Sequence, residues 1–257
     1  MSIPIGLLLL CISMLLAAGG LILVQRLVPN EVRMQHNDVA GFIYAVLGVV
    51  YAVLLGLMVV AVWEQWNAAA GRADEEASEL AEVFWIADRM PESDGHHIQE
   101  LVRAYARVVV EEEWPLMRQG KSSQKAWALL DEIRSEVQDF QPSTPAQTVL
   151  YEQGLERVHA LADARRGRLL LADHGLPAIL WVVLLIGGVV VIGFTYLFGL
   201  DSTVIHVLMV AALALIIALV LFTVAELDFP FRGDIRLGPE AMEQVLDRFE
   251  TSTLSDL

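Results

Sequence analysis

Four apolar runs alternate with polar segments along the chain, and each run is long enough to cross a lipid bilayer. They cover residues 3–24, 39–63, 176–198 and 203–225. A hydrocarbon core is spanned by about 20 consecutive apolar residues. The polar stretch between the second and third runs is far longer than an ordinary helix connection. The pattern therefore predicts an all-α, polytopic membrane protein with four transmembrane helices and a helical domain inserted between helices 2 and 3.

The same pattern divides the chain into four segments. Residues 1–63 hold transmembrane helices 1 and 2, residues 64–175 form a cytoplasmic helical domain, residues 176–225 hold helices 3 and 4, and residues 226–257 form a cytoplasmic tail. The first run lacks a positive flank and exceeds the roughly 7–15 apolar residues of a signal peptide, so we expect it to be a retained helix. The lipid bilayer is the first expected partner.

The second transmembrane helix is predicted to continue far beyond the membrane. No proline occurs from Val39 to Met90, and its polar half carries an apolar seam with alternating steps of three and four residues, typical of heptads. The seam consists of Trp63, Trp66, Ala70, Ala73, Ala77, Leu80, Phe84 and Ala87. This spacing predicts packing along one side of the helix. The partner is either another helix of the same chain or a second copy of the chain.

Three more helices are expected in the inserted domain. Their apolar positions recur at helical spacing over residues 93–114, 122–140 and 144–172. Ser93 or Asp94, Ser122, and Ser143 or Thr144 are expected at the starts of these helices, because their side chains accept hydrogen bonds from unpaired backbone amides.

Charge adds an orientation to this picture. Almost all of the net charge of −15 lies in residues 64–173 and 226–257. Lys and Arg near membrane ends favour the cytoplasm. Arg165, Arg166 and Arg168 precede the third helix, and Arg232 and Arg236 follow the fourth, whereas the connection at residues 199–202 has no base. Both termini and the inserted domain are therefore expected in the cytoplasm. Arg26 and Arg33, in the first connection, weakly oppose this orientation.

Several classes of function have no support in the residues. Cys11 is the single cysteine, so an intrachain disulfide or a cysteine metal cluster is not available. No H-E-x-x-H, P-loop or G-x-S-x-G motif occurs, and we expect neither enzymatic activity nor a bound cofactor or metal. No basic stripe is present, so nucleic-acid binding is not expected.

The second apolar run carries the most informative candidate surface. Small residues recur along one broad face, at Gly41, Ala45, Gly48, Ala52 and Gly56. Such a face favours either close packing between membrane helices or a pore wall that leaves room for an ion. The second, third and fourth runs contain no charged residue, so a pore would have to control conduction through a hydrophobic constriction.

Two motifs resemble those of the bacterial bestrophin-like family. The first is HNDVAGFIYAVLGVVYAVLLGLMVVAVWEQW from His36, followed by an acidic helix, and the second is LDFPFRGDIRL at residues 227–237. The resemblance covers nearly the whole chain. The family is distantly similar to the bestrophins, which are pentameric ion channels whose second membrane helix lines the pore and whose cytoplasmic domain encloses a vestibule.

The resemblance implies an oligomeric ion channel or pore of the bacterial inner membrane, with a homo-oligomer, pentameric by analogy, and inorganic ions as partners. Its pore-lining candidates are Tyr44, Gly48, Tyr51, Ala52, Gly56 and Val59, and its tail motif comprises Asp228, Pro230, Phe231, Gly233 and Asp234. Arg232 interrupts the bestrophin proline-phenylalanine-glycine element, so the bestrophin calcium clasp is not carried over. The alternative is a membrane-anchored helical scaffold or sensory protein without conductance.

Overall fold

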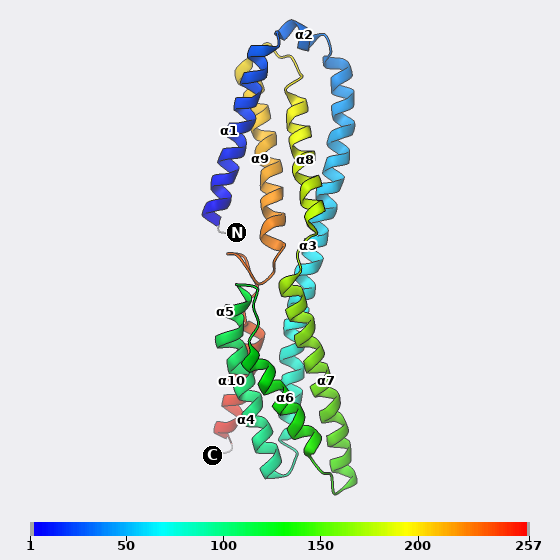
Figure 1. The fold of residues 1–257 in the computed structure, drawn as a ribbon, viewed down its shortest axis with the longest axis vertical. Helices are drawn as coiled ribbons and strands as arrows, with labels where there is room; N and C mark the ends of the chain where they lie inside the picture. Colours follow the sequence, from blue (N-terminus) through cyan, green and yellow to red (C-terminus); the bar gives the residue numbers. More distant parts are fainter. Residues whose placement is uncertain (1–2, 256–257) are drawn as a thin grey trace. The chain divides into compact units, whose positions relative to one another are not determined.

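The structure, a computed structural model, describes residues 3–255, with side chains to residue 251, and divides the chain into two compact units. Unit 1 comprises Met1–Glu64 and Gly175–Asp228, and unit 2 comprises Gln65–His174 and Phe229–Leu257. Every regular element within residues 3–255 is a helix (Figure 1). The all-α fold predicted from the sequence is confirmed.

Unit 1 contains the membrane-spanning part of the chain. Its helices are α1 (Ile3–Leu27), the short α2 (Asn30–Met34), the first half of α3 (Asn37–Ala87), α8 (Ala178–Thr195) and α9 (Thr203–Leu227). The four long helices each contain an 18-residue window with a mean hydropathy of at least 2.7, and at most 22% of each window is buried. Helices this apolar and this exposed require a lipid surround. The chain is therefore a multi-pass membrane protein.

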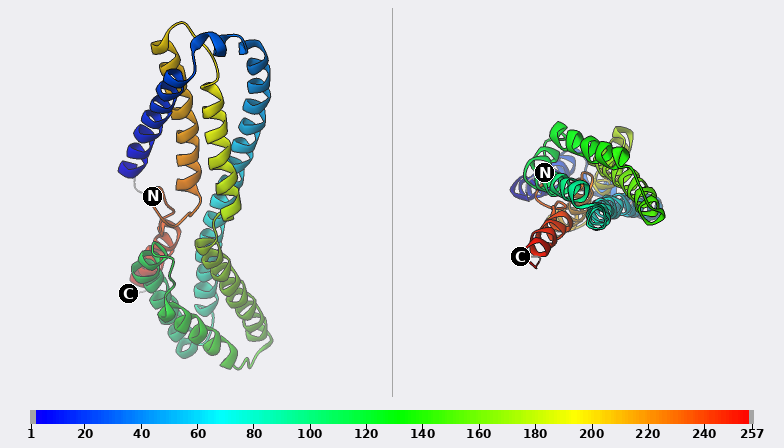
Figure 2. Two further views of the ribbon diagram at one scale, coloured as in Figure 1. Left: turned by 45° about the horizontal axis from the view of Figure 1, so that its top comes forward. Right: turned by 90° about the horizontal axis from the view of Figure 1, so that it is seen from below.

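Two buried clusters hold unit 1 together, one between α1 and α9 and one in which α3, α8 and α9 meet (Figure 2). Leu21 of α1 packs against Ala214 of α9 in one buried cluster. In the other, Tyr51 of α3 lies so close to α8 that a Cβ at Gly187 would be 2.7 Å from its ring. Glycine is therefore required there, because the missing side chain lets the two helices approach.

The connection between α1 and α3 is tied to the connection between α8 and α9. The Asn37 side chain donates to the Gly199 carbonyl at 2.8 Å and accepts from the Gly199 amide at 3.0 Å. The buried Arg33 guanidinium donates to the Phe198 carbonyl at 3.1 Å. These bonds satisfy backbone groups that would otherwise be unpaired beside the membrane.

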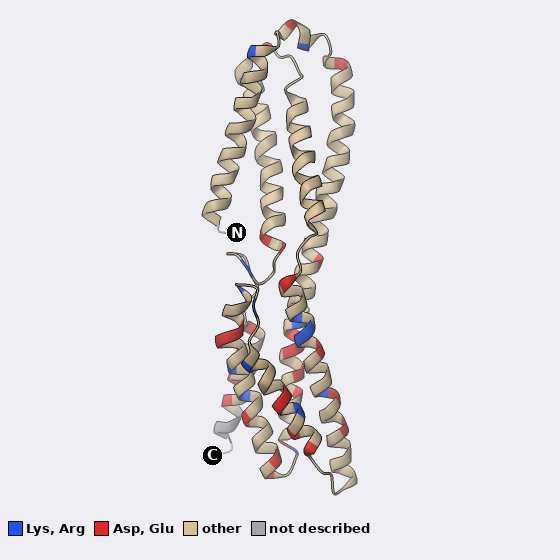
Figure 3. Cartoon of the chain, viewed as in Figure 1, with Lys and Arg blue, Asp and Glu red and all other residues tan. Residues whose placement is uncertain are grey.

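Unit 2 is a helical bundle built around the second half of α3. It adds α4 (Glu92–Val108), a π-helical turn η1 (Val109–Glu113), α5 (Trp114–Met117), α6 (Gln124–Asp139), α7 (Pro145–Asp173) and α10 (Glu240–Ser255). Charged side chains gather on these helices, whereas the spans of unit 1 are almost free of them (Figure 3). The ring of Phe249 on α10 stacks on Phe84 of α3, with centroids 4.1 Å apart.

The long helix runs without interruption from Asn37 to Ala87, as predicted. The structure also identifies the partner of its apolar seam. Ala73, Ala77, Leu80, Phe84 and Ala87 are buried in one core with α4, α6, α7 and α10 of the same chain. Over these residues the seam therefore packs within the protomer, while Trp63 at its start is exposed.

The helix starts agree with the sequence only in part. Thr144 accepts from the Gln147 amide at 3.2 Å at the start of α7, as expected. At α6 the cap is Ser123, which accepts from the Ala126 amide at 3.3 Å, and not its neighbour Ser122. The prediction of a side-chain cap at Ser93 or Asp94 is wrong, because α4 begins at Glu92 and its capping position is Pro91, which has no side-chain acceptor.

Candidate functional site

The protomer leaves one face of α3 in unit 1 uncovered, and this face holds the small residues. Ala52 and Gly56 are exposed, and Gly48 is half-buried. A Cβ added at Gly48 or Gly56 would meet no heavy atom within 4 Å. Each of these three residues follows the previous one by four positions, and at this spacing small side chains let membrane helices approach closely. The half-buried Val59 continues the same face.

The structure separates the two tyrosines from this face. Tyr51 is buried, and its hydroxyl donates to the Leu184 carbonyl of α8 at 2.9 Å. Tyr44 stacks on Phe194, with centroids 6.0 Å apart. Successive residues are turned about 100° around a helix, which points Tyr51 toward α8 and leaves its neighbour Ala52 uncovered. The ring and hydroxyl of Tyr51 are therefore committed to α8 within the protomer.

The tail motif begins with a buried carboxylate. Asp228 accepts from the Leu176 amide at 2.6 Å and from the Trp181 indole at 3.2 Å. Leu176 lies just before α8 and Trp181 lies in its first turn, whereas Asp228 directly follows α9. Asp228 therefore ties the end of α9 to the start of α8 within unit 1.

The rest of the motif forms a tight turn in unit 2. The carbonyl of Pro230 accepts from the Leu237 amide at 2.8 Å, and Gly233 has φ +79°, which favours glycine. The buried Phe231 meets Trp114 edge to face, with centroids 5.9 Å apart, while Asp234 is exposed. The motif therefore stabilises a turn. In the described residues no group of His, Cys, Asp or Glu is arranged to hold a metal ion.

Arg232, which interrupts the bestrophin element, has a clear role in this turn. Its guanidinium donates to the Ala172 carbonyl at 3.2 Å and pairs with Asp173 at 3.3 Å. Both partners lie in the last turn of α7, where a positive charge interacts favourably with the helix dipole. The guanidinium also lies over the Phe229 ring, 4.6 Å from its centroid. Arg232 thus fastens the tail segment to α7.

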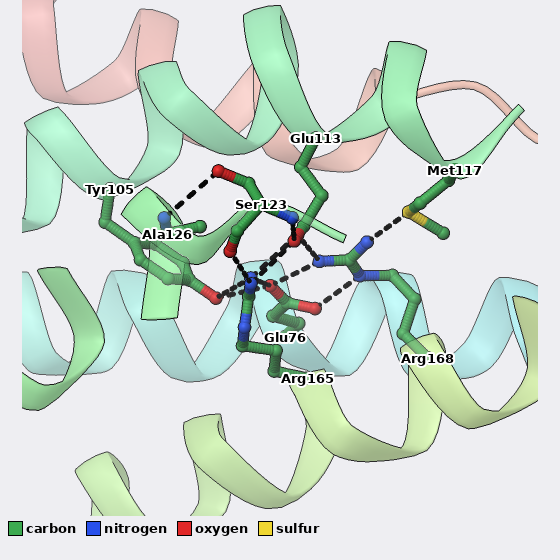
Figure 4. Close-up of polar contacts among 8 residues, drawn as sticks. All are labelled: Glu76, Tyr105, Glu113, Met117, Ser123, Ala126, Arg165 and Arg168. Carbon is green, nitrogen blue, oxygen red and sulfur yellow. Dashed lines mark hydrogen bonds and ion pairs between the residues drawn. The ribbon is translucent and has the colours of Figure 1, made fainter. Parts of the chain in front are cut away.

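A fully buried network of charges lies in the core of unit 2 (Figure 4). Arg165 of α7 forms a two-pronged pair with Glu113 of η1, at 2.6 and 2.7 Å. Arg168, one turn later, binds Glu76 of α3 at 2.5 Å and Glu113 at 2.7 Å. The Tyr105 hydroxyl donates to Glu76 at 2.6 Å and accepts from Arg165 at 3.1 Å. The two negative charges and the two positive charges of this buried network therefore neutralise each other.

Comparison with known proteins identifies the family of this chain. The bestrophin-like domain family matches residues 11–242 of the chain. This chain belongs to the bestrophin-like family. The crystal structure of a bacterial bestrophin homologue from Klebsiella pneumoniae is similar at a TM-score of 0.68 and 15% identity, over 93% of this chain and 96% of that chain. A variant of the same homologue matches at 0.69 and 15%, over 93% and 97%. This similarity concerns the fold. No curated protein matches the sequence.

In this bestrophin-like chain the network keeps its charges at neutral pH. Burial alone would raise the pKa of Glu113, but the charges and hydrogen bonds of Arg168 and Arg165 outweigh it and hold that pKa below its usual value. Burial and the nearby Glu76 raise the pKa of Tyr105 well above its usual value, so its hydroxyl stays protonated and donates. The network is therefore a fixed link between α3, α4, η1 and α7.

The sequence did contain a signal for this network. Arg165 and Arg168 occupy the buried face of α7, in register with Val158, Leu161 and Ala172. A base in an apolar stripe indicates a buried partner. The π-helical turn adds a residue to the preceding helix, which changes the direction in which Glu113 points, and sequence periodicity gives no sign of it.

Proposed function

We propose that this bestrophin-like protein is a homo-oligomeric ion channel of the bacterial inner membrane, and that α3 lines its pore. One observation carries the proposal. Within the protomer, the uncovered side of α3 carries a stripe of small residues, Gly48, Ala52 and Gly56, next to larger apolar side chains. The resemblance to bestrophins, and the fold shared with the Klebsiella bestrophin homologue, support the channel class.

The proposed pore lining contains fewer residues than the sequence suggested. We keep Gly48, Ala52, Gly56 and Val59 and leave Tyr44 and Tyr51 to the contact with α8. Copies of the chain that turn this face toward a common axis would enclose a narrow, apolar path. Such a path conducts when wetted and closes by losing its water, so no charged filter is needed. Five copies are proposed by analogy with bestrophins.

The proposed orientation places both termini, the segment at residues 64–175 and the tail in the cytoplasm. Arg166, Arg232 and Arg236 support it. Arg165 and Arg168 no longer do, because their charges are neutralised by Glu76 and Glu113.

Labelling of the exposed Gln119 tests the orientation. In a Cys11→Ala background, Gln119→Cys is expected to resist an impermeant maleimide in intact cells that have a permeabilised outer membrane, and to react after lysis. Labelling in the intact cells would overturn the orientation. The buried Ser123 would be a poor probe, because a cysteine there would be shielded from the reagent whichever side of the membrane it occupied.

Water access at Ala52 tests the pore lining. In the Cys11→Ala background, Ala52→Cys should react with a charged methanethiosulfonate reagent in proteoliposomes, because the thiolate that reacts forms only in contact with water. Ala212→Cys, on an exposed position of α9, is the matched control and should stay unreactive in lipid. Equal protection of both cysteines in an intact oligomer would contradict an aqueous path along α3 and favour a scaffold without conductance.

A further inference from the structure

Unit 1 has an apolar crevice between α1, α8 and α9, at the end where α8 begins and α9 ends. Its volume is about 330 Å³. The lining includes Gly6 and Ser13 of α1, Trp181 and Leu185 of α8, and Ala218 and Phe222 of α9. A Cβ at Gly6 would collide with the Phe222 ring, so this ring of α9 packs directly on the backbone of α1.

The few side-chain donors of the lining are already occupied. The Ser13 hydroxyl donates to the Leu10 carbonyl of its own helix at 2.8 Å. The Trp181 indole donates to Asp228 at 3.2 Å. A water molecule needs two to four polar partners to occupy a cavity, and here both donors are engaged, which leaves the Ser13 oxygen as the one side-chain acceptor in the lining. The crevice therefore suits an apolar occupant.

The membrane supplies that occupant. The flanking Leu9 and Leu185 are about half exposed, at 48% and 54%, and belong to helices that span the bilayer, so the crevice opens to hydrocarbon. An empty crevice would forfeit dispersion contacts along its walls. A helix from a second copy, about 10 Å across, is too wide to enter, whereas a flexible hydrocarbon chain conforms to the space. Trp181 is of the residue type that marks the headgroup level of the bilayer.

We infer that this crevice binds one acyl chain of a membrane phospholipid. The acyl chain lies against Ser13 of α1, Leu185 of α8 and Ala218 of α9, beside the closed contact of Gly6 with Phe222. The lipid is recognised by its chain, since the lining offers no free side-chain donor to a headgroup. The inference is independent of whether the protein conducts ions, because the crevice is separate from the uncovered face of α3.

Photocrosslinking from the lipid chain tests the inference. Full-length protein is reconstituted in vesicles of phosphatidylethanolamine and phosphatidylglycerol with a trace of phosphatidylcholine that carries a diazirine within one acyl chain. After irradiation, peptides containing residues 6–13 and 218–225 should be labelled several-fold more than the other exposed parts of α1 and α9. Ala218→Phe fills the crevice and should remove this excess. Ala212→Phe, an exposed position on the same helix outside the crevice, should leave it unchanged.

A second variant keeps the test decisive if Ala218→Phe does not fold. Leu221→Ala enlarges the crevice and should increase the labelling. Even labelling of all exposed apolar positions, or an excess unaffected by either crevice variant, would overturn the inference. So would a disulfide between two copies through Leu185→Cys in the Cys11→Ala background, because a neighbouring chain would then cover the crevice.

Discussion

Replacing Arg168 with methionine is expected to lower the free energy of unfolding by about 3–5 kcal/mol, because removal of one partner leaves a buried charge uncompensated. The Arg168 guanidinium binds both Glu76 and Glu113, and none of the three side chains is exposed to solvent. Without it, two carboxylates share the single charge of Arg165. Urea unfolding of the purified protein in detergent, followed by tryptophan fluorescence, measures the change, and the Arg168 guanidinium lies 4.7 Å from the centroid of one of these rings, Trp114.

Two further variants separate charge balance from lost packing. Arg166→Met, two positions away on the same helix, removes only an exposed pair with Asp163 and should cost at most about 1 kcal/mol. Glu76→Gln added to Arg168→Met removes the surplus charge and keeps an acceptor for Tyr105, so it should recover much of the loss. If the double variant is no more stable than Arg168→Met, uncompensated charge is not the cause.

The same network sets the acid sensitivity of unit 2. The pKa of Glu113 is lower in the folded protein than in the unfolded chain, so its contribution to stability is complete above the usual carboxyl range. That contribution is lost as the pH falls through the lowered pKa. The difference in stability between the protein and Arg168→Met should therefore shrink in acid, below a pH of about 4. A difference that stays constant down to pH 2 would contradict this account.

Ala52→Trp is expected to reduce ion flux through reconstituted protein about tenfold or more, since each 1.4 kcal/mol added to a barrier slows passage tenfold. Ala52 lies in the stripe of small residues on the uncovered side of α3, and a narrow axis cannot accept an indole without strain of about 1–3 kcal/mol. The oligomer mass in detergent should be unchanged, because the proposed assembly turns this stripe toward the axis. Ala212→Trp is the matched control on a lipid-exposed position and should retain full flux.

The two alternative outcomes have distinct meanings. Unchanged flux with an intact oligomer would remove Ala52 from the pore. Loss of the oligomer would mean that Gly48, Ala52 and Gly56 pack against a neighbouring helix, the other function of small residues in membranes. Mass and flux are therefore measured on the same preparation.

Helices were predictable here because their signals are local. Four long apolar runs and the absence of proline between Val39 and Met90 were enough to define the spans and the uninterrupted α3. The heptad seam correctly predicted which side of α3 is buried from Ala73 to Ala87. Its partner was not predictable, because an apolar seam has the same spacing whether it meets its own chain or another copy.

The polar contacts were harder to predict because they join distant parts of the sequence. Arg168 and Glu76 are 92 positions apart, and Arg168 and Glu113 are 55 apart. Bases shortly before a membrane helix ordinarily indicate the cytoplasmic side, which concealed that Arg165 and Arg168 belong to a buried stripe. The contact of Tyr51 with α8 was hard to predict for a related reason, because it depends on Gly187 and Gly188 of a helix far along the sequence.

Planar-bilayer recording from purified protein of measured oligomer mass tests the central claim most directly. The account predicts discrete ionic currents from an oligomer of the unmodified chain. The currents should be lost in Ala52→Trp and kept in Ala212→Trp. An intact oligomer of the unmodified chain that passes no current would contradict the channel and leave a membrane-anchored helical scaffold as the function of this bestrophin-like protein.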